Sequence, residues 1–305
     1  MDGAELALTA ARGAHLAAAL AAFGIAVFGH VVAPPLLRDA ETAARDRFET
    51  ASRRLYRAAI VVAAAAGLVW LIGVAADAAE ADSLADAAAA VWPMLTDTPF
   101  GRDLGLRLVL LAGAGLVLGN GAGGWRRTAA ASAAGAAVLL QAWAAHAAAA
   151  SGIDRAILLG AESLHLLAAG TWLGSLPVLF ILVRRLPPEL GARALQRFSP
   201  FGLFCVAIIA VSALAQGWLL IGSVPAVFGT DYGRVALLKA ALFLAMLALA
   251  ATNRFHHARV LGGKPQADAT RWLCRCVGLE LALGIAVVFA AALLAGLPPP
   301  VDTVP

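Results

Sequence analysis

Two histidines and one glutamate lie where an apolar chain could hold a metal ion. His146 ends one long apolar segment, and His165 lies inside the next with Glu162 three residues before it. Residues three apart share a helix face, so Glu162 could orient the imidazole of His165 or bind a metal itself. An ionisable group in such a segment is a candidate functional group. The alternative is that His165 is a packing residue held by hydrogen bonds.

The connection between these two segments determines how the histidines can meet. It is short, around residues 151–155, and this predicts two antiparallel neighbouring helices with His146 and His165 at similar depths. The pair could then share one ion, because neutral imidazole is a common metal ligand. His15, in the first apolar segment, is a further candidate ligand on the same side.

Five other residues are candidates for secondary metal sites. Met94 lies near Trp92 in an acidic loop, where a thioether could capture Cu(I). The other four share one basic loop, where they could receive a soft metal: His256, His257, Cys274 and Cys276. A single methionine and a Cys-x-Cys spacing are weak signals on their own. We expect His30 at the membrane interface rather than in a site.

Four cationic residues open two of the apolar segments: Arg102, Arg107, Arg234 and Lys239. Long cationic side chains near helix ends can extend to the membrane interface, and this predicts that they are anchors. The alternative is that they line a pathway through the protein.

The composition indicates what kind of protein must position these groups. Hydrophobic residues make up 61% of the 305, charged residues make up 14%, and the mean hydropathy is +0.83. These values lie outside the range of soluble globular domains and predict an all-α polytopic membrane protein. A membrane-spanning helix needs about 20 mostly apolar residues. Eight transmembrane helices are expected: roughly 14–33, 56–77, 101–119, 128–149, 156–183, 200–222, 234–252 and 277–297.

The basic residues predict the orientation of the chain. Most of its 23 lysines and arginines lie in the first, third, fifth and seventh loops, whereas the second loop is acidic. By the positive-inside rule the basic loops are cytoplasmic, and both termini lie outside. Because the charge distribution indicates topology, we expect no nucleic-acid partner despite the net charge of +4.

Short motifs recur in the two halves of the chain. The stretch Thr98-Pro-Phe-Gly-Arg102 matches Thr230-Asp-Tyr-Gly-Arg234, and the four residues after His15 resemble those after His165. This predicts two four-helix repeats in parallel orientation, with a functional site where they meet. In the first repeat, residues 1–127 hold the first three helices and residues 128–149 the fourth. Residues 150–305 form the second repeat.

Motifs for enzymatic chemistry are missing from the sequence. It has no Gly-x-x-x-x-Gly-Lys-Ser/Thr loop for nucleotide phosphates, and no serine or cysteine nucleophile in a recognisable His/Asp context. We therefore expect a protein that is not an enzyme and is not driven by ATP.

The ordered motifs of the second half resemble the copper resistance protein D family of bacterial membrane proteins. They are His146 in Trp-Ala-Ala-His-Ala-Ala, the run 165–174, Arg197-Phe-Ser199, Gly217-Trp218, Thr230 to Arg234 with Lys239, and Asn253-Arg254. The resemblance implies an inner-membrane protein of eight helices that takes part in copper resistance and moves copper toward the cytoplasm. It also implies a separate periplasmic copper-binding protein of the CopC type. With the orientation given above, an inner-membrane location makes both termini periplasmic.

These observations favour copper transport, with copper, membrane lipid and a CopC-like protein as partners. In this hypothesis His146 and His165 bind the ion, and His15 and Glu162 assist. One alternative is a haem-binding redox protein, because two histidines on facing helices can also ligate haem. The other is a membrane protein that binds copper without moving it.

Overall fold

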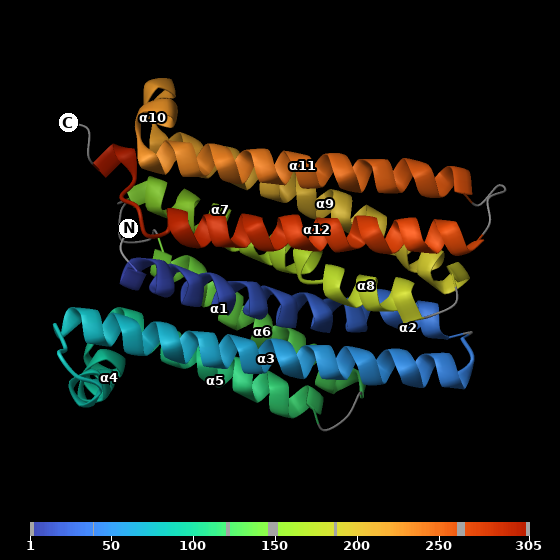
Figure 1. Ribbon diagram of the computed structural model, residues 1–305, viewed down its shortest axis with the longest axis horizontal. Helices are drawn as coiled ribbons and strands as arrows, with labels where there is room; N and C mark the ends of the chain where they lie inside the picture. The colour runs from blue at the N-terminus through green and yellow to red at the C-terminus, as the bar shows by residue number, and fades with distance from the viewer. Residues whose placement is uncertain are drawn as a thin grey trace.

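The protein is a bundle of long helices that run along one axis (Figure 1). The computed structural model describes residues 3–38, 40–119, 123–145, 152–185, 188–260 and 266–302. These residues form helices and no strand. Helices are the structure expected of apolar segments in lipid, because a helix satisfies its own backbone hydrogen bonds.

The helices follow one another along the chain without large insertions. They are α1 (Gly3–Val27), the π-helical turn η1 (Phe28–Val32), α2 (Ala33–Leu37), α3 (Thr42–Ala78), α4 (Leu84–Asp97), α5 (Pro99–Gly119), α6 (Gly124–Ala145), α7 (Gly152–Leu173), α8 (Leu176–Arg185), α9 (Pro188–Ile221), α10 (Val224–Gly229), α11 (Asp231–Val260), α12 (Gln266–Leu294) and the short 3-10 helix η2 (Pro300–Asp302). We call residues 3–145 the first half and residues 152–302 the second half.

Six stretches in the described part of the chain are long and apolar enough to cross a membrane. They are Gly3–Leu37, Thr42–Ala78, Gly152–Arg184, Arg193–Ile221, Asp231–Thr252 and Arg271–Leu294. The structure thus confirms an all-α, multi-pass membrane protein. The other two expected spans correspond to α5 and to α6, and residues 146–149 at the end of the latter lie outside the described residues.

Helix α1 lies at the centre of the bundle and connects its two halves. It packs on α3 and α6 of the first half and on α7 and α12 of the second. Figure 1 shows α3 and α5 on one side of α1, and α11 and α9 on the other. The two halves therefore meet along α1.

Glycines allow α1 to approach the second half very closely. A Cβ atom added to Gly174 would lie 2.0 Å from the carbonyl oxygen of Leu20, and one added to Gly24 would lie 2.2 Å from the backbone of Gly174. The hydroxyl of Ser175 also donates to the carbonyl of Gly24 at 3.1 Å. The contact coincides with a break between α7 and α8, so the expected continuous span 156–183 consists of two helices.

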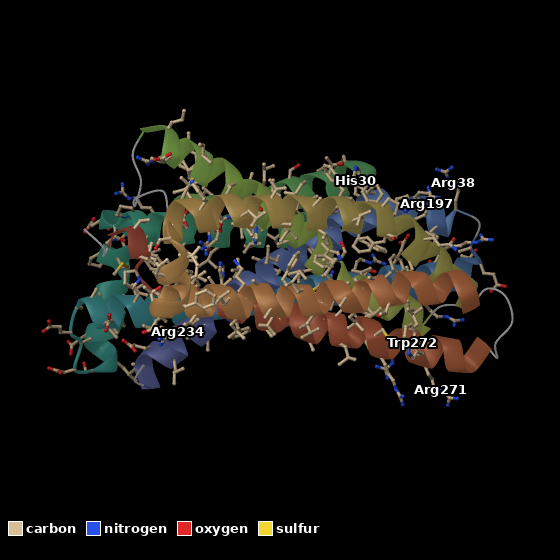
Figure 2. The ribbon with its side chains drawn as sticks, turned by 90° about the horizontal axis from the view of Figure 1, so that it is seen from above. His30, Arg38, Arg197, Arg234, Arg271 and Trp272 are labelled. Atoms are coloured by element: carbon tan, nitrogen blue, oxygen red, sulfur yellow. The ribbon has the colours of Figure 1, made fainter. Side chains whose placement is uncertain are left out.

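The two ends of the bundle differ in what they carry. Both termini, α4 and α10 lie at one end, which we call the terminal end (Figure 1). Figure 2 shows Arg234 at this end, whereas Arg38, Arg197 and Arg271 lie toward the opposite, far end. His30, which is exposed, also lies toward the far end.

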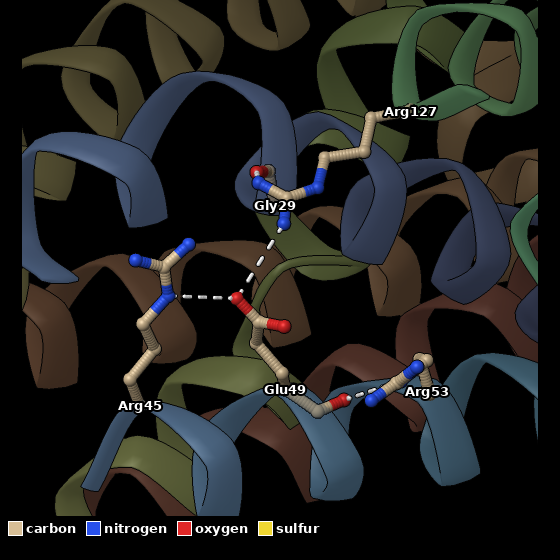
Figure 3. A network of polar contacts seen from close by, with 5 residues as sticks. All are labelled: Gly29, Arg45, Glu49, Arg53 and Arg127. Atoms are coloured by element: carbon tan, nitrogen blue, oxygen red, sulfur yellow. Dashed lines mark hydrogen bonds and ion pairs between the residues drawn. The ribbon is translucent and has the colours of Figure 1, made fainter. Parts of the chain in front are cut away.

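A polar network at the far end joins α3 to the π-helical turn (Figure 3). Pro34 and Pro35 follow that turn, and neither can donate the backbone hydrogen bond that a regular helix needs. The carbonyl of Gly29 instead accepts from Arg127 Nη1 at 3.2 Å. Glu49 pairs with Arg45 at 3.1 Å and with Arg127 at 3.7 Å, so this network fixes the first half where α1 becomes irregular.

Candidate metal site

His165 is held by a neighbouring helix in a way that leaves one ring nitrogen for a metal. The side chain is only 8% exposed, and Nδ1 lies 2.9 Å from the hydroxyl of Ser212 on α9. That oxygen is 2.7 Å from the carbonyl of Ile208 and 3.1 Å from the carbonyl of Ile209. A hydroxyl has one proton, which Ser212 donates to a carbonyl, so it accepts from Nδ1–H of His165. The lone pair of the neutral ring is then on Nε2.

His15 is oriented by the same principle in the first half. Its Nδ1 lies 2.8 Å from the backbone carbonyl of Ala63 on α3. A carbonyl oxygen can only accept, so Nδ1 carries the proton and Nε2 carries the lone pair. The side chain is 1% exposed and packs beside Gly67, where an added Cβ would lie 2.8 Å from Nδ1.

A polar cavity of about 80 Å³ lies between the two halves, on the side of the bundle nearer the terminal end. Its wall on α12 is apolar, including Val287, Val288 and Ala291. Five other helices supply polar side chains: Arg12 from α1, Gln141 from α6, Glu162 and His165 from α7, Gln216 from α9, and Tyr232 and Lys239 from α11.

Glu162 and His165 line this cavity together, as their three-residue spacing predicts. Lys239 lines it too and interacts electrostatically with both. A carboxylate and a neutral imidazole can bind a copper ion, whereas the nearby ammonium group repels it. Their role as metal ligands stays a prediction.

Arg107 does not extend to the membrane interface, so the prediction that it is an anchor is wrong. Only 2% of this residue is exposed. Its Nη1 donates to Asp103 at 3.2 Å and to Gln141, and its guanidinium lies 5.6 Å from the ring centre of Trp70. These contacts compensate part of the buried charge, and Nη2 of Arg107 has no hydrogen-bond partner among the described residues. The i,i+4 spacing of Asp103 and Arg107 was the signal in the sequence for this pair.

The aromatic ring of Trp70 packs against His15. It lies 6.1 Å from the His15 ring and 5.0 Å from Phe100. The guanidinium of Arg12 lies 5.4 Å from the same ring, so two arginines contact Trp70. His15 does not line the cavity that contains His165.

The other candidate ligands are not gathered around His165. The hydroxyl of Thr98 donates to the Met94 sulfur at 3.2 Å, and Met94 packs in the hydrophobic cluster around Trp70. Cys276 is eleven residues before Val287, which is about 17 Å along a helix. Cys274 is half-buried near Arg184, toward the far end.

Three predicted histidine ligands have side chains outside the described residues. His146 lies in the stretch 146–151, which the structure does not describe. His256 and His257 belong to α11, but their side chains are not described either. In the part of the chain that is described, no three His, Cys, Asp or Glu side chains are grouped to hold a metal ion. Glu162 and His165 are thus the two candidate ligands that the structure brings together.

Several residues of the site were not identified from the sequence. They are Arg12, Gln141, Ser212, Gln216 and Tyr232. The four-residue spacing of Ser212 and Gln216 in an apolar segment places two polar groups on one helix face, and this was the available signal.

Comparisons with known proteins agree with the copper resemblance. A family model described as "Copper resistance protein D-like, N-terminal domain" matches residues 3–156, and one described as "Copper resistance protein D" matches residues 192–294. No solved structure matches the chain.

Three curated relatives are similar over about half of the chain. Copper transport protein CutJ of Bacillus subtilis (strain 168) is 33% identical over 172 residues, which are 55% of this chain and 30% of the relative. Inner membrane protein YebZ of Escherichia coli (strain K12) is 33% identical over 53% of the chain and 56% of the relative. Copper resistance protein D of Pseudomonas syringae pv. tomato is 30% identical over 55% of the chain and 58% of the relative. The matched region therefore spans less than two thirds of each relative.

Proposed function

Because the chain belongs to the copper resistance protein D family, we propose that it carries copper ions across the bacterial inner membrane and receives them at His165. The observation that carries this proposal is the position of His165 in a polar cavity between the two halves, with Nδ1 held by Ser212. A metal ligand that is oriented through its second nitrogen is the usual arrangement of a histidine site.

Glu162 is the second ligand in this proposal, and His146 completes the set from the neighbouring segment. The carboxylate lines the same cavity as His165. Imidazole and carboxylate bind Cu(II) well, and imidazole also binds Cu(I). His15 has a free Nε2 but lies apart from the cavity, so it acts as a helper rather than as the receiving ligand.

The two halves form the path as repeats of one four-helix unit, giving eight spans. Equivalent hydrogen bonds support this duplication. The backbone N–H of Gly101 donates to the Thr98 hydroxyl at 3.0 Å, and that of Gly233 donates to the Thr230 hydroxyl at 3.0 Å. In both halves a histidine is bonded to the next long helix, and the interruption between α7 and α8 is of the kind that transporters use near their sites.

Copper moves from the periplasm to the cytoplasm in this proposal. The arginines at the far end support a cytoplasmic location for that end, and hence periplasmic termini (Figure 2). The cavity is then nearer the periplasm, where a CopC-like protein could deliver the ion. The relatives are named as a copper transport protein and as an inner membrane protein, which agrees with this path. We propose transport rather than an enzymatic reaction.

Copper influx into liposomes that contain the purified protein tests the proposal. We expect His165→Ala to reduce influx to that of protein-free liposomes. His30→Ala is the matched control, because His30 is exposed and lies toward the far end, and it should transport like the wild type. Unchanged influx in His165→Ala would exclude the proposed route.

The same preparation distinguishes the two alternatives. Copper binding to the wild type without influx would indicate a protein that binds copper and does not transport it. A haem absorption band in the purified protein would indicate the redox alternative.

A further inference from the structure

Two buried N–H groups in the wall of the cavity have no acceptor. One is Nε of Arg12, whose Nη1 donates to the carbonyl of Ala292 at 3.2 Å. The other is Nε2 of Gln216 on the opposite half. Both residues line the cavity that contains His165. Buried donors are nearly always paired, so each of these two donors needs an acceptor, and the cavity that both residues line can hold it.

The charges around the cavity have the sign that favours an anion. Arg12 and Lys239 contribute two positive charges, and Glu162 contributes one negative charge. Arg107, which reaches the cavity wall through its bond to Gln141, is already paired with Asp103. One positive charge is therefore left without a counterion, and an uncompensated buried charge is costly.

The volume is suitable for a small ion. The cavity measures about 80 Å³, and a single water needs about 10–15 Å³ of such space. A halide with its bound waters fits this space. A halide also accepts several hydrogen bonds at once, so it can satisfy donors from two helices.

We propose that this cavity binds one small monovalent anion of the size of chloride, held by Arg12, Gln216 and Lys239. The ion pairs the orphaned donors and neutralises the excess charge between the two halves. It also lowers the positive potential that a copper ion meets at His165. Only this last consequence rests on the proposed copper function, because the anion is held by side chains that need no metal.

Chloride binding to the metal-free, full-length protein tests the proposal. The line width of the chloride NMR signal is measured in detergent solution at increasing chloride, with gluconate keeping the ionic strength constant. We expect saturable broadening for the wild type and about tenfold weaker binding for Arg12→Gln, which loses a charge-assisted donor. Arg234→Gln is the matched control: it removes an arginine at the same end that is exposed and lines no part of the cavity, and it should bind like the wild type.

Gln216→Met provides a second variant if Arg12→Gln does not fold. It removes the other orphaned donor and keeps the charge, so we expect weaker chloride binding with an unchanged elution profile. Two results would overturn the proposal: a wild type without saturable broadening, or equal losses in Arg12→Gln and Arg234→Gln. Because copper is absent, neither result depends on whether the protein transports copper.

Discussion

The environments of His15 and His165 show that one helical framework holds two histidines in the same way but in different surroundings. Both rings donate through Nδ1 to the next long helix, at the Ala63 carbonyl in one half and at the Ser212 hydroxyl in the other. Both therefore present Nε2 away from that helix. The framework alone does not distinguish a metal ligand from a packing residue.

The surroundings of the two rings differ in their charged residues and in how tightly side chains pack around the ring. Three residues before His15 the chain has Arg12, whereas three residues before His165 it has Glu162. Trp70 is 6% exposed and packs against His15, but Trp218, which precedes Leu-Leu-Ile-Gly as Trp70 precedes Leu-Ile-Gly, is 79% exposed. The first environment is a packed position close to Arg107, and the second is a cavity lined by the Glu162 carboxylate as well as by Arg12 and Lys239. This difference is why we assign the copper ion to the second half.

The close contact between Gly174 and Leu20 holds the two halves together, and breaking it has the largest expected effect. In Gly174→Ala the new methyl group would lie 2.0 Å from the backbone of Leu20. We expect a loss of at least about 3 kcal/mol in the free energy of unfolding, because backbone atoms cannot move aside easily. Gly160→Ala on α7 is the control, since its Cβ would meet nothing within 4 Å. Thermal unfolding in detergent measures both, and equal stability of the two variants would contradict the close contact.

Replacing each histidine in turn tests the assignment of the ion directly. His165→Ala should abolish copper binding and leave the protein folded. His15→Ala should keep copper binding but lower the free energy of unfolding by about 2–5 kcal/mol, because it empties a packed position. Isothermal titration with copper and thermal unfolding provide the two measurements. If His15→Ala also abolishes binding in a folded protein, the two environments are not functionally different.

The negative charge of Glu162 is a further difference between the surroundings of the two histidines, and it can be removed by itself. Glu162→Gln should weaken copper binding by at least about 10- to 100-fold, because changing even a group that only supports a metal ligand has an effect of this size. Glu80→Gln is the matched control, because Glu80 is exposed in the loop after α3 and changes the net charge equally. Equal copper affinity of the two variants would show that the charge at position 162 is not the relevant difference.

The helical, multi-pass fold could be predicted from the sequence because it depends on local composition. Apolar segments of about 20 residues, separated by charged loops, are enough to predict helices in lipid. The break after Leu173 could not be predicted, since it depends on how closely Gly174 approaches α1. Such a contact between distant segments leaves no periodic signal.

The candidate site could be predicted only in part. The spacing of Glu162 and His165 indicated a shared face, and both line the cavity. Arg107 was misassigned because its cation–π contact with Trp70 joins two helices. The sequence of neither helix indicates this contact by itself. Gln216 and Arg12 were missed for the same reason, since a cavity is formed by several helices and not by one segment.

The smallest expected effect comes from Ser212, which orients His165 without touching the metal. Ser212→Ala removes the acceptor of the Nδ1 proton, so either nitrogen of the neutral ring can then carry it. We expect copper affinity to fall by about tenfold. Ser212→Thr keeps the hydroxyl and should restore the affinity. Nitrogen NMR of the labelled, metal-free histidine measures the tautomer: one form in the wild type and in Ser212→Thr, and a mixture in Ser212→Ala. A loss of affinity with no change in tautomer would mean that Ser212 acts through packing, and the two histidines would then differ in how they are held as well as in what surrounds them.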